Sequence, residues 1–138
     1  MVLKHPIDAF TVNNLATDAL ARASSSGLPG LHLGPADAFR HCFWNCRMAQ
    51  ELGATRAEQF ATAHENSGPS PIPFDNQMDL HDNAFGRTLG TPGANCEAAC
   101  RAAVASGQLR SIRGPDTHPQ ATPPVPGACI GASNQPWP

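Results

Sequence analysis

Residues 35–53 read PADAFRHCFWNCRMAQELG, and this stretch decides the fold. Pro35 suits the first turn of a helix, where its missing N–H would have no partner, and Gly53 can adopt the left-handed conformation that ends one. Helical spacing predicts a core face made of Phe39, Cys42, Phe43, Cys46 and Ala49. We therefore expect a helix that starts after Gly34 and ends at Gly53, with one side buried.

The rest of the chain predicts four more helices and a tail. Apolar residues at helical spacing predict helices over residues 11–24 and 78–89, and a further helix that starts at Thr91 and Pro92 and ends at Gly107. Thr55 and Glu58 fit a capping box for a helix that ends near His64. Seven of the 14 prolines lie in residues 111–138, which have no apolar period. The sequence thus predicts an all-α compact bundle of about five short helices over residues 1–110, followed by a Pro-rich tail.

Composition excludes several classes of protein. The 138 residues are 41% hydrophobic and 14% charged, with a formal net charge of −2. These values argue against a highly charged disordered chain and against a basic nucleic-acid binder. The longest apolar stretches are far shorter than the roughly 20 residues that span a bilayer, and the N-terminus lacks the apolar centre of a signal peptide. We expect one domain with no transmembrane segment and no secretion signal.

Four of the five cysteines form two Cys-x3-Cys pairs, Cys42 with Cys46 and Cys96 with Cys100. Residues one helical turn apart have Cβ atoms about 5–6 Å apart, whereas a disulfide needs about 3.5–4.5 Å, so bridges between the two helices are favoured. Antiparallel helices would pair Cys42 with Cys100 and Cys46 with Cys96, which we predict, whereas parallel helices would pair Cys42 with Cys96. A four-thiolate zinc site and buried free thiols are the alternatives. Disulfides would indicate an oxidising compartment, with Cys129 as a free thiol or an intermolecular link.

A polar stripe runs along the helix that begins at Pro35. Asp37, His41 and Asn45 share this stripe, and Trp44 and Met48 flank it. Polar groups beside two large apolar side chains are typical of a cleft wall. The alternative is a solvated helix face on which Asp37 caps the N-terminus.

The third predicted helix ends with two ionisable residues. His64 shares a face with Ala57, Phe60 and Ala61, so we expect it to point at the core. Glu65 follows at the point where the helix breaks, which places its carboxylate well for entering a cleft.

The fourth predicted helix carries Asp79, Asn83 and Gly86 on one stripe, while His81 points elsewhere. A glycine inside a helix costs about 1 kcal/mol relative to alanine, so Gly86 is best explained by the close approach of another helix or a ligand. A solvated face is again the alternative.

Two kinds of chemistry fit these residues. A histidine with a carboxylate can move protons at neutral pH, and two histidines with carboxylates can hold a divalent metal that activates water. The candidate metal ligands are His41, His64 and Asp79. The candidate catalytic residues are His41, His64, Glu65, Asp79 and Asn83. No HExxH motif, phosphate loop, nucleophile elbow or Rossmann glycine pattern occurs in the sequence.

Three blocks of this sequence resemble the C-terminal toxin domains of bacterial polymorphic toxins, including Rhs-repeat proteins and other secreted effectors. The blocks read D-A-x-R-H-x-x-W, A-H-E and M-D-L-H-x-N-x-x-G-R, and they span about Gly34 to Gly90. The matching residues are Asp37, Arg40, His41, Trp44, His64, Glu65, Asp79, His81, Asn83, Gly86 and Arg87. Asp82 departs from the pattern, where an asparagine is expected, and this weakens any role for it.

The resemblance implies a toxin that a secretion machine, such as type VI secretion, or a carrier polypeptide delivers, with an immunity protein as partner. It names no substrate. Our leading hypothesis is an envelope hydrolase that acts on peptidoglycan or phospholipid in the periplasm of a target bacterium. The candidate binding residues are Asp37, Arg40, Trp44, Asn45, His81 and Arg87.

Two rival hypotheses remain. The first is a metal-dependent nuclease in the cytoplasm, which low positive charge argues against because backbone binding draws on Lys and Arg. The second is a non-enzymatic, disulfide-stapled binding module.

Overall fold

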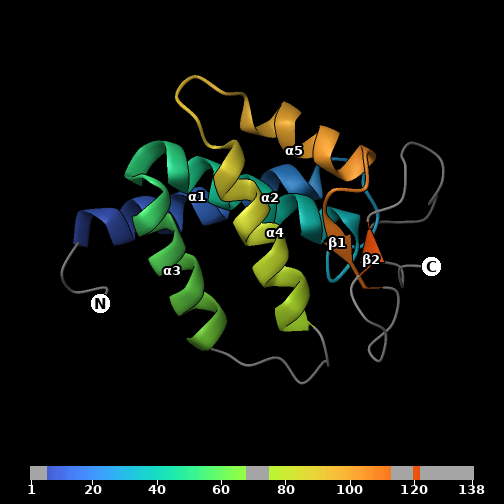
Figure 1. Cartoon of the computed structure of the whole chain (residues 1–138), viewed down its shortest axis with the longest axis horizontal. Coiled ribbons are helices and arrows are strands. Elements are labelled where there is room, and N and C mark those ends of the chain that lie inside the picture. The colour runs from blue at the N-terminus through green and yellow to red at the C-terminus, as the bar shows by residue number, and fades with distance from the viewer. Residues whose placement is uncertain (1–5, 68–74, 113–119, 122–138) are drawn as a thin grey trace.

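The computed structural model of the chain describes residues 6–67, 75–112 and 120–121. Its helices are α1 (Pro6–Ser24), α2 (Pro35–Leu52), α3 (Ala54–Ser67), α4 (Asp75–Leu89) and α5 (Cys96–Ala105). Two short strands, β1 (Arg110–Ser111) and β2 (Gln120–Ala121), pair antiparallel. The predicted all-α bundle of five helices is confirmed (Figure 1).

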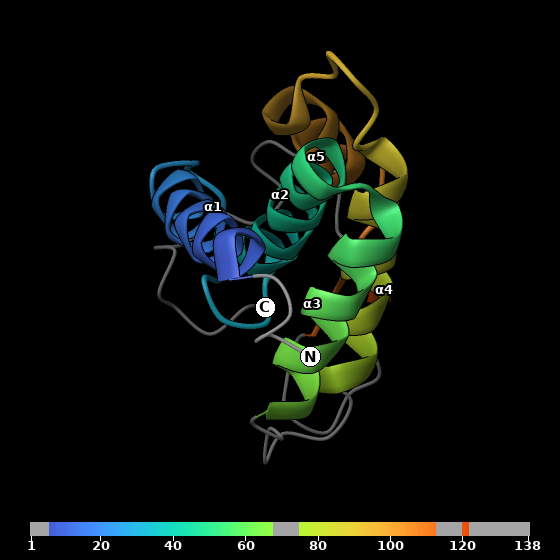
Figure 2. The ribbon, with the colours of Figure 1, turned by 90° about the vertical axis from the view of Figure 1, so that its left-hand side faces the viewer.

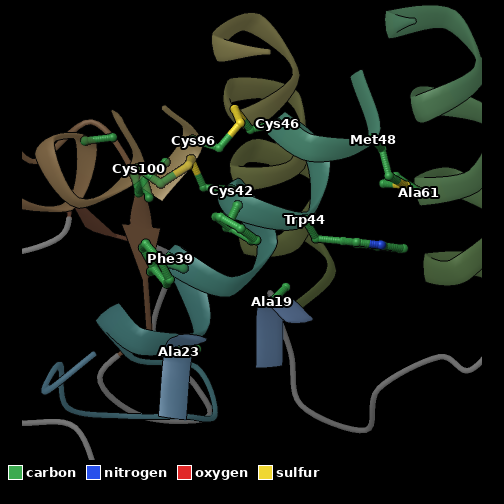
Figure 3. Packing of buried hydrophobic residues seen from close by; sticks show 14 of the residues in the cluster. Ala19, Ala23, Phe39, Cys42, Trp44, Cys46, Met48, Ala61, Cys96 and Cys100 are labelled. Atoms are coloured by element: carbon green, nitrogen blue, oxygen red, sulfur yellow. A yellow bond between two sulfur atoms is a disulfide. The ribbon is translucent and has the colours of Figure 1, made fainter. Parts of the chain in front are cut away.

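Helix α2 is the centre of the bundle. Thirteen of its 18 residues are buried. Figure 2 shows why: α1 lies on one side of α2, α3 and α4 lie on the other, and α5 covers a third side. The predicted core face of α2 is buried in full, and Met48 packs on the side of Ala61 in α3 (Figure 3). The sequence stretch that predicts the fold therefore supplies its central helix.

The predicted disulfides are confirmed. Cys42 is bonded to Cys100 with their Cα atoms 5.9 Å apart, and Cys46 is bonded to Cys96 with a Cα separation of 5.8 Å. Both join α2 to α5 in the antiparallel arrangement (Figure 3). This rules out a zinc site or free thiols at these four cysteines. Cys129 lies outside the described residues.

Two helix starts were predicted wrongly. Helix α3 begins at Ala54, where the Ala57 N–H bonds to the Gly53 carbonyl, so Thr55 lies inside the helix and forms no capping box. Helix α5 begins at Cys96 and not at Thr91, because the Asn95 side chain accepts a hydrogen bond from the Ala98 N–H at 3.0 Å. Threonine and asparagine can both cap a helix, so the sequence offered two starts and the structure uses the later one.

Other boundaries extend beyond the predicted ones. Helix α1 begins at Pro6, five residues earlier than predicted, and α3 and α4 each gain three residues at the breaking loop. The core also continues past Arg110, because Leu109 and Ile112 are buried and the Ile112 N–H donates to the Leu33 carbonyl at 2.8 Å. Residues 113–119 and 122–138 of the predicted tail lie outside the described part of the chain.

Helix α4 lies unusually close to α2. A Cβ atom at Gly86 would lie 2.8 Å from the Cys42 Cα, and one at Gly90 would lie 2.6 Å from the Ala49 Cβ. Such distances leave no room for a side chain, as predicted for Gly86. The contact brings the polar stripe of α4 against the polar stripe of α2. Among the described residues, no helix is long and apolar enough to cross a membrane.

Candidate active site

The polar stripes of α2 and α4 meet inside the protein. Asp37 and His41 are each 2% exposed, Asn83 is 1% exposed, and Asn45 is fully buried. The alternative of solvated helix faces is therefore wrong for these residues, and the α2 stripe is not an open cleft wall. The capping part of that alternative is wrong as well, because α2 begins after Gly34 without a side-chain cap, and Asp37 Oδ2 instead accepts a hydrogen bond from the Leu33 N–H in the preceding loop.

A chain of side-chain hydrogen bonds fixes the orientation of His41. Arg87 can only donate, and it donates to Asn45 Oδ1 at 3.0 Å. Asn45 Nδ2 therefore points the other way and donates to Asn83 Oδ1 at 2.8 Å. The same oxygen lies 3.1 Å from His41 Nδ1, so this nitrogen must carry a proton. His41 Nε2 is left facing the carboxylates.

Two carboxylates and one guanidinium surround His41 Nε2. This nitrogen lies 3.1 Å from Asp79 Oδ1 and 3.4 Å from Asp37 Oδ1. Arg40 donates to Asp37 Oδ1 at 2.8 Å, and the same guanidinium nitrogen lies 3.1 Å from His41 Nε2. Leu33, whose N–H binds Asp37, has a positive φ of 72°, a strained conformation for a leucine. The chain thus bends at some cost to complete the surroundings of Asp37.

The carboxylates differ in their affinity for protons. Burial alone would raise the pKa of Asp37, but its hydrogen bond to His41 and the charges of His41 and Arg40 hold it well below its usual value. Burial raises the pKa of Asp79 to about 8, against the opposing charge of His41, and the charges of Asp37 and Glu65 add to the increase. One carboxylate is therefore ionised and the other holds a proton at neutral pH, a division that favours acid–base roles.

His41 itself is a strong base here. Burial lowers its pKa, but the hydrogen bond and charge of Asp37, followed by the charge of Asp79, outweigh burial and raise the pKa to about 9. Arg40 opposes this increase because its charge has the same sign. The His41 and Asp79 pair therefore carries protons that it can transfer.

Three predicted site residues lie outside this network or at its edge. The prediction that His64 points at the core is wrong: the residue is exposed and its ring packs edge-on against Trp44, with centroids 5.2 Å apart. Glu65 is partly exposed, and its charge acts on both His64 and Asp79. His81 lies apart, stacked on Phe85 and with Nε2 3.0 Å from the Gln108 carbonyl.

Sequence reasoning missed the environment of Asp82. Its side chain is fully buried, and Oδ1 accepts a hydrogen bond from the Arg110 N–H at 2.8 Å. Burial raises its pKa well above the usual value. Asp82 therefore anchors β1 to α4. The only signal in the sequence is the departure from the family pattern at this position.

The residues that could bind a metal ion differ from the predicted set. One donor atom from each of Asp37, His41 and Asp79 lies within 4.8 Å of the others, so Asp37 takes the place predicted for His64. These atom types suit a divalent transition metal. The Arg40 guanidinium contacts two of the three residues, so an entering cation would have to displace it.

A pocket of about 340 Å³ lies between α1, α2 and α3. Arg40, Trp44 and His64 contribute to its wall. The Trp44 indole crosses to α1, where its N–H donates to the Val12 carbonyl at 3.2 Å. Arg40 therefore belongs both to the pocket and to the buried network.

The comparisons with known proteins give a family but no activity. A family described as Domain of unknown function (DUF6973) matches residues 1–106, most of the chain. No solved structure matches the chain. The matched residues include the whole of α1 to α4 and therefore every residue of the buried network. The chain belongs to the DUF6973 family.

Proposed function

We propose that the chain is an antibacterial secreted effector domain that hydrolyses a component of the target cell's envelope, with His41 and Asp79 as its acid–base pair. The observation that carries this proposal is the 3.1 Å contact between His41 Nε2 and Asp79 Oδ1. Only 3% of the His41 side chain is exposed, whereas 15% of the Asp79 side chain is. The pair therefore lies where a buried network approaches solvent.

Each residue of the network has a role in this hydrolysis. The reactive form is the fraction of molecules in which Asp79 has lost its proton, a fraction that grows as the pH approaches its pKa of about 8. In this form the Asp79 carboxylate takes a proton from water while the water oxygen attacks the substrate carbon. The bond from that carbon to the leaving oxygen breaks, and protonated His41 gives its Nε2 proton to that oxygen. Asp79 then returns its proton to His41, which restores the pair. Asn83 holds the Nδ1–H of His41, and Arg40 supplies positive charge where negative charge develops.

A purely structural role explains this network poorly. Burying ionisable groups costs free energy unless their hydrogen bonds are complete. Asp79 Oδ1 is buried, and its 3.1 Å contact with His41 Nε2 lacks the alignment of a hydrogen bond, so no residue that the structure describes satisfies this oxygen. A polar atom left in this state is typical of a site that is arranged for a reaction and not for stability.

The cellular setting is the second part of the proposal. Two disulfides are typical of proteins that fold in oxidising compartments, and this supports action in the periplasm. The resemblance to polymorphic toxin domains supplies the partners, namely a secretion machine or carrier polypeptide and an immunity protein. Nine basic against 11 acidic residues disfavour a nucleic-acid substrate.

Purified, oxidised protein should be incubated with isolated sacculi and with phospholipid vesicles, and soluble fragments and free fatty acids should be measured. We expect one substrate to be cleaved, and His41→Gln and Asp79→Asn to lose at least about a hundredfold in rate. His32→Gln and Asp18→Asn are the matched controls, because both residues lie away from the network, and they should keep full activity. Cleavage of neither substrate with the disulfides intact would overturn the hydrolase proposal.

Toxicity with and without export to the periplasm tests the compartment. We expect growth inhibition only with export. Inhibition confined to the cytoplasm, with loss of DNA or RNA, would establish the nuclease instead. Folded His41→Gln and Asp79→Asn proteins with full toxicity would establish the binding module.

A further inference from the structure

The pocket between α1, α2 and α3 has mostly apolar walls. Ala9 and Ala16 line it from α1, Ala63 lines it from α3, and Trp44 and Phe60 add aromatic surface. Its volume of about 340 Å³ falls at the lower end of the roughly 300–1,000 Å³ typical of small-ligand sites. Because much of the lining is alanine, the pocket offers a ligand few hydrogen-bonding groups. An unbranched methylene chain suits this space, whereas the hydroxyl and amide groups of a glycan–peptide polymer would lose their partners there.

The charged groups of the pocket lie beside the acid–base pair. Arg40 and His64 are the two ionisable residues of its wall. The Arg40 guanidinium is 2.8 Å from Asp37 Oδ1 and 3.1 Å from His41 Nε2. A ligand with an apolar chain in the alanine-lined part and a polar head at Arg40 would therefore present that head to the pair.

The outer surface of α1 exposes three large apolar side chains. Ile7 is 80% exposed, Phe10 is 60% exposed and Leu20 is 51% exposed. All three belong to the helix that carries Ala9 and Ala16. Ile7 and Phe10 lie one helical turn apart, and exposed apolar side chains of this kind can insert into a lipid surface. Such side chains could insert into a lipid layer and bring the pocket close to a lipid acyl chain.

We infer that this pocket binds the acyl chain of a lipid and that the envelope substrate is a lipid acyl ester and not peptidoglycan. The inference rests on the proposed hydrolytic function and adds the substrate class. Water and the ester would give a fatty acid and an alcohol, with the ester at Arg40 and the chain against Trp44.

Trp44 itself can report binding. The chain has two tryptophans, so Trp137→Phe leaves Trp44 as the one emitter. This oxidised protein should be titrated with undecanoic acid brominated at its terminal carbon, below the concentration at which the acid forms micelles. A bromine atom that enters the pocket quenches Trp44 on contact. We expect saturable quenching.

Filling the pocket provides the specificity control. Ala16→Phe and Ala63→Phe place a ring in the pocket from two different helices, and we expect each to weaken binding at least about tenfold, a loss of about 1.4 kcal/mol. Ala21→Phe is the matched control, since Ala21 is exposed on α1 and does not line the pocket. Quenching that never saturates, or that both filled variants retain, would overturn the inference.

The outcomes separate this inference from the proposed function. Asp79→Asn should keep saturable quenching while losing hydrolysis of phospholipid vesicles. Saturable quenching without hydrolysis of vesicles or sacculi would leave the acyl pocket in place and overturn the hydrolase. Hydrolysis of sacculi by a protein that does not bind the brominated acid would keep the hydrolase and overturn the lipid assignment.

Discussion

At the scale of single residues, the state of His41 follows from an asparagine two helices away in the sequence. Asn83 accepts hydrogen bonds from both Asn45 and His41, so only the other imidazole nitrogen, Nε2, faces Asp79. The sequence predicted that these residues share stripes. It also predicted that they border a common cleft, but not that the α2 and α4 stripes are buried against each other, because periodicity gives the face of a helix but not the neighbour that covers it.

The protonation of the network predicts how stability depends on pH. The folded pKa of His41 is about 9 against an ordinary 6.5, and that of Asp79 is about 8 against 3.8. The folded state therefore binds more protons than the unfolded state over these windows, and stability falls as the pH rises. Asp37 has the opposite sign, since its lowered pKa makes it stabilising above 3.8 and this contribution is lost in acid.

We expect the free energy of unfolding to fall from pH 6.5 to 9, most steeply between 6.5 and 8, where both groups contribute. Urea unfolding at a series of pH values measures this. Asp79→Asn should make the free energy of unfolding less dependent on pH below pH 8, and His32→Gln should not change this dependence. The other charged groups around the pair are Arg40 on α2, His64 and Glu65 on α3, and Asp75 and Asp82 on α4. A wild-type stability that rises over this range would show that the pair has lost its protons.

Arg40 predicts the response to chelators. Its guanidinium already contacts Asp37 and His41, so positive charge is present without a metal. We expect dialysis against EDTA to leave hydrolysis unchanged, and Arg40→Gln to reduce it at least about tenfold through the lost charge. Activity that disappears with EDTA and returns with added Zn²⁺ or Mn²⁺ would assign Asp37, His41 and Asp79 to a metal instead.

At the scale of elements, the contact between α2 and α4 positions the pair. Glycine at positions 86 and 90 lets α4 approach the α2 backbone, and the sequence predicted this from the cost of Gly86 in a helix. The start of α5 was not predictable in the same way. Two capping candidates lie four residues apart, and the packing of Cys96 and Cys100 against α2 selects the later one.

Gly86→Ala tests this contact. The added methyl group would meet the Cys42 backbone, which no side-chain movement can relieve, so α4 must move away. We expect a loss of about 1–3 kcal/mol in stability and a larger loss of activity than of stability. Thermal unfolding and the hydrolysis rate measure the two effects. Ala84→Ser, an exposed change on the same helix, should leave both within error. An alanine variant with native activity would show that the pair tolerates displacement of α4.

At the scale of the whole molecule, the two disulfides act as one staple. They close loops with separations of 58 and 50 residues, and one loop lies inside the other. Once either bond has formed, the second closes a ring of only about ten residues, so its contribution is smaller. The one-turn spacing within each cysteine pair predicted bridges between two helices, whereas the choice of partners depends on the antiparallel packing of α2 and α5, which spacing does not determine. The predicted place of His64 failed because α3 turns its last residues past Trp44 toward solvent.

Replacing cysteines in pairs measures this coupling. We expect Cys42→Ala with Cys100→Ala to cost about 2–3 kcal/mol, and replacement of all four cysteines to cost about 6 kcal/mol. The second value is comparable to the whole stability of many small domains, so this variant should be largely unfolded. Urea unfolding measures both, and the four-fold variant should not respond to reductant. A cost for the four-fold variant equal to the sum of the costs of removing each bond alone would mean that the bonds do not share one loop.

The burial of α2 also has a kinetic consequence. A helix covered on three sides by other helices cannot open without separating the bundle, so its amide protons should exchange with solvent deuterium only through global unfolding. The amides of α3, whose outer face is exposed, should exchange earlier. Any motion that exposes His41 to a small molecule must therefore come from the surrounding helices, while α2 itself stays in place.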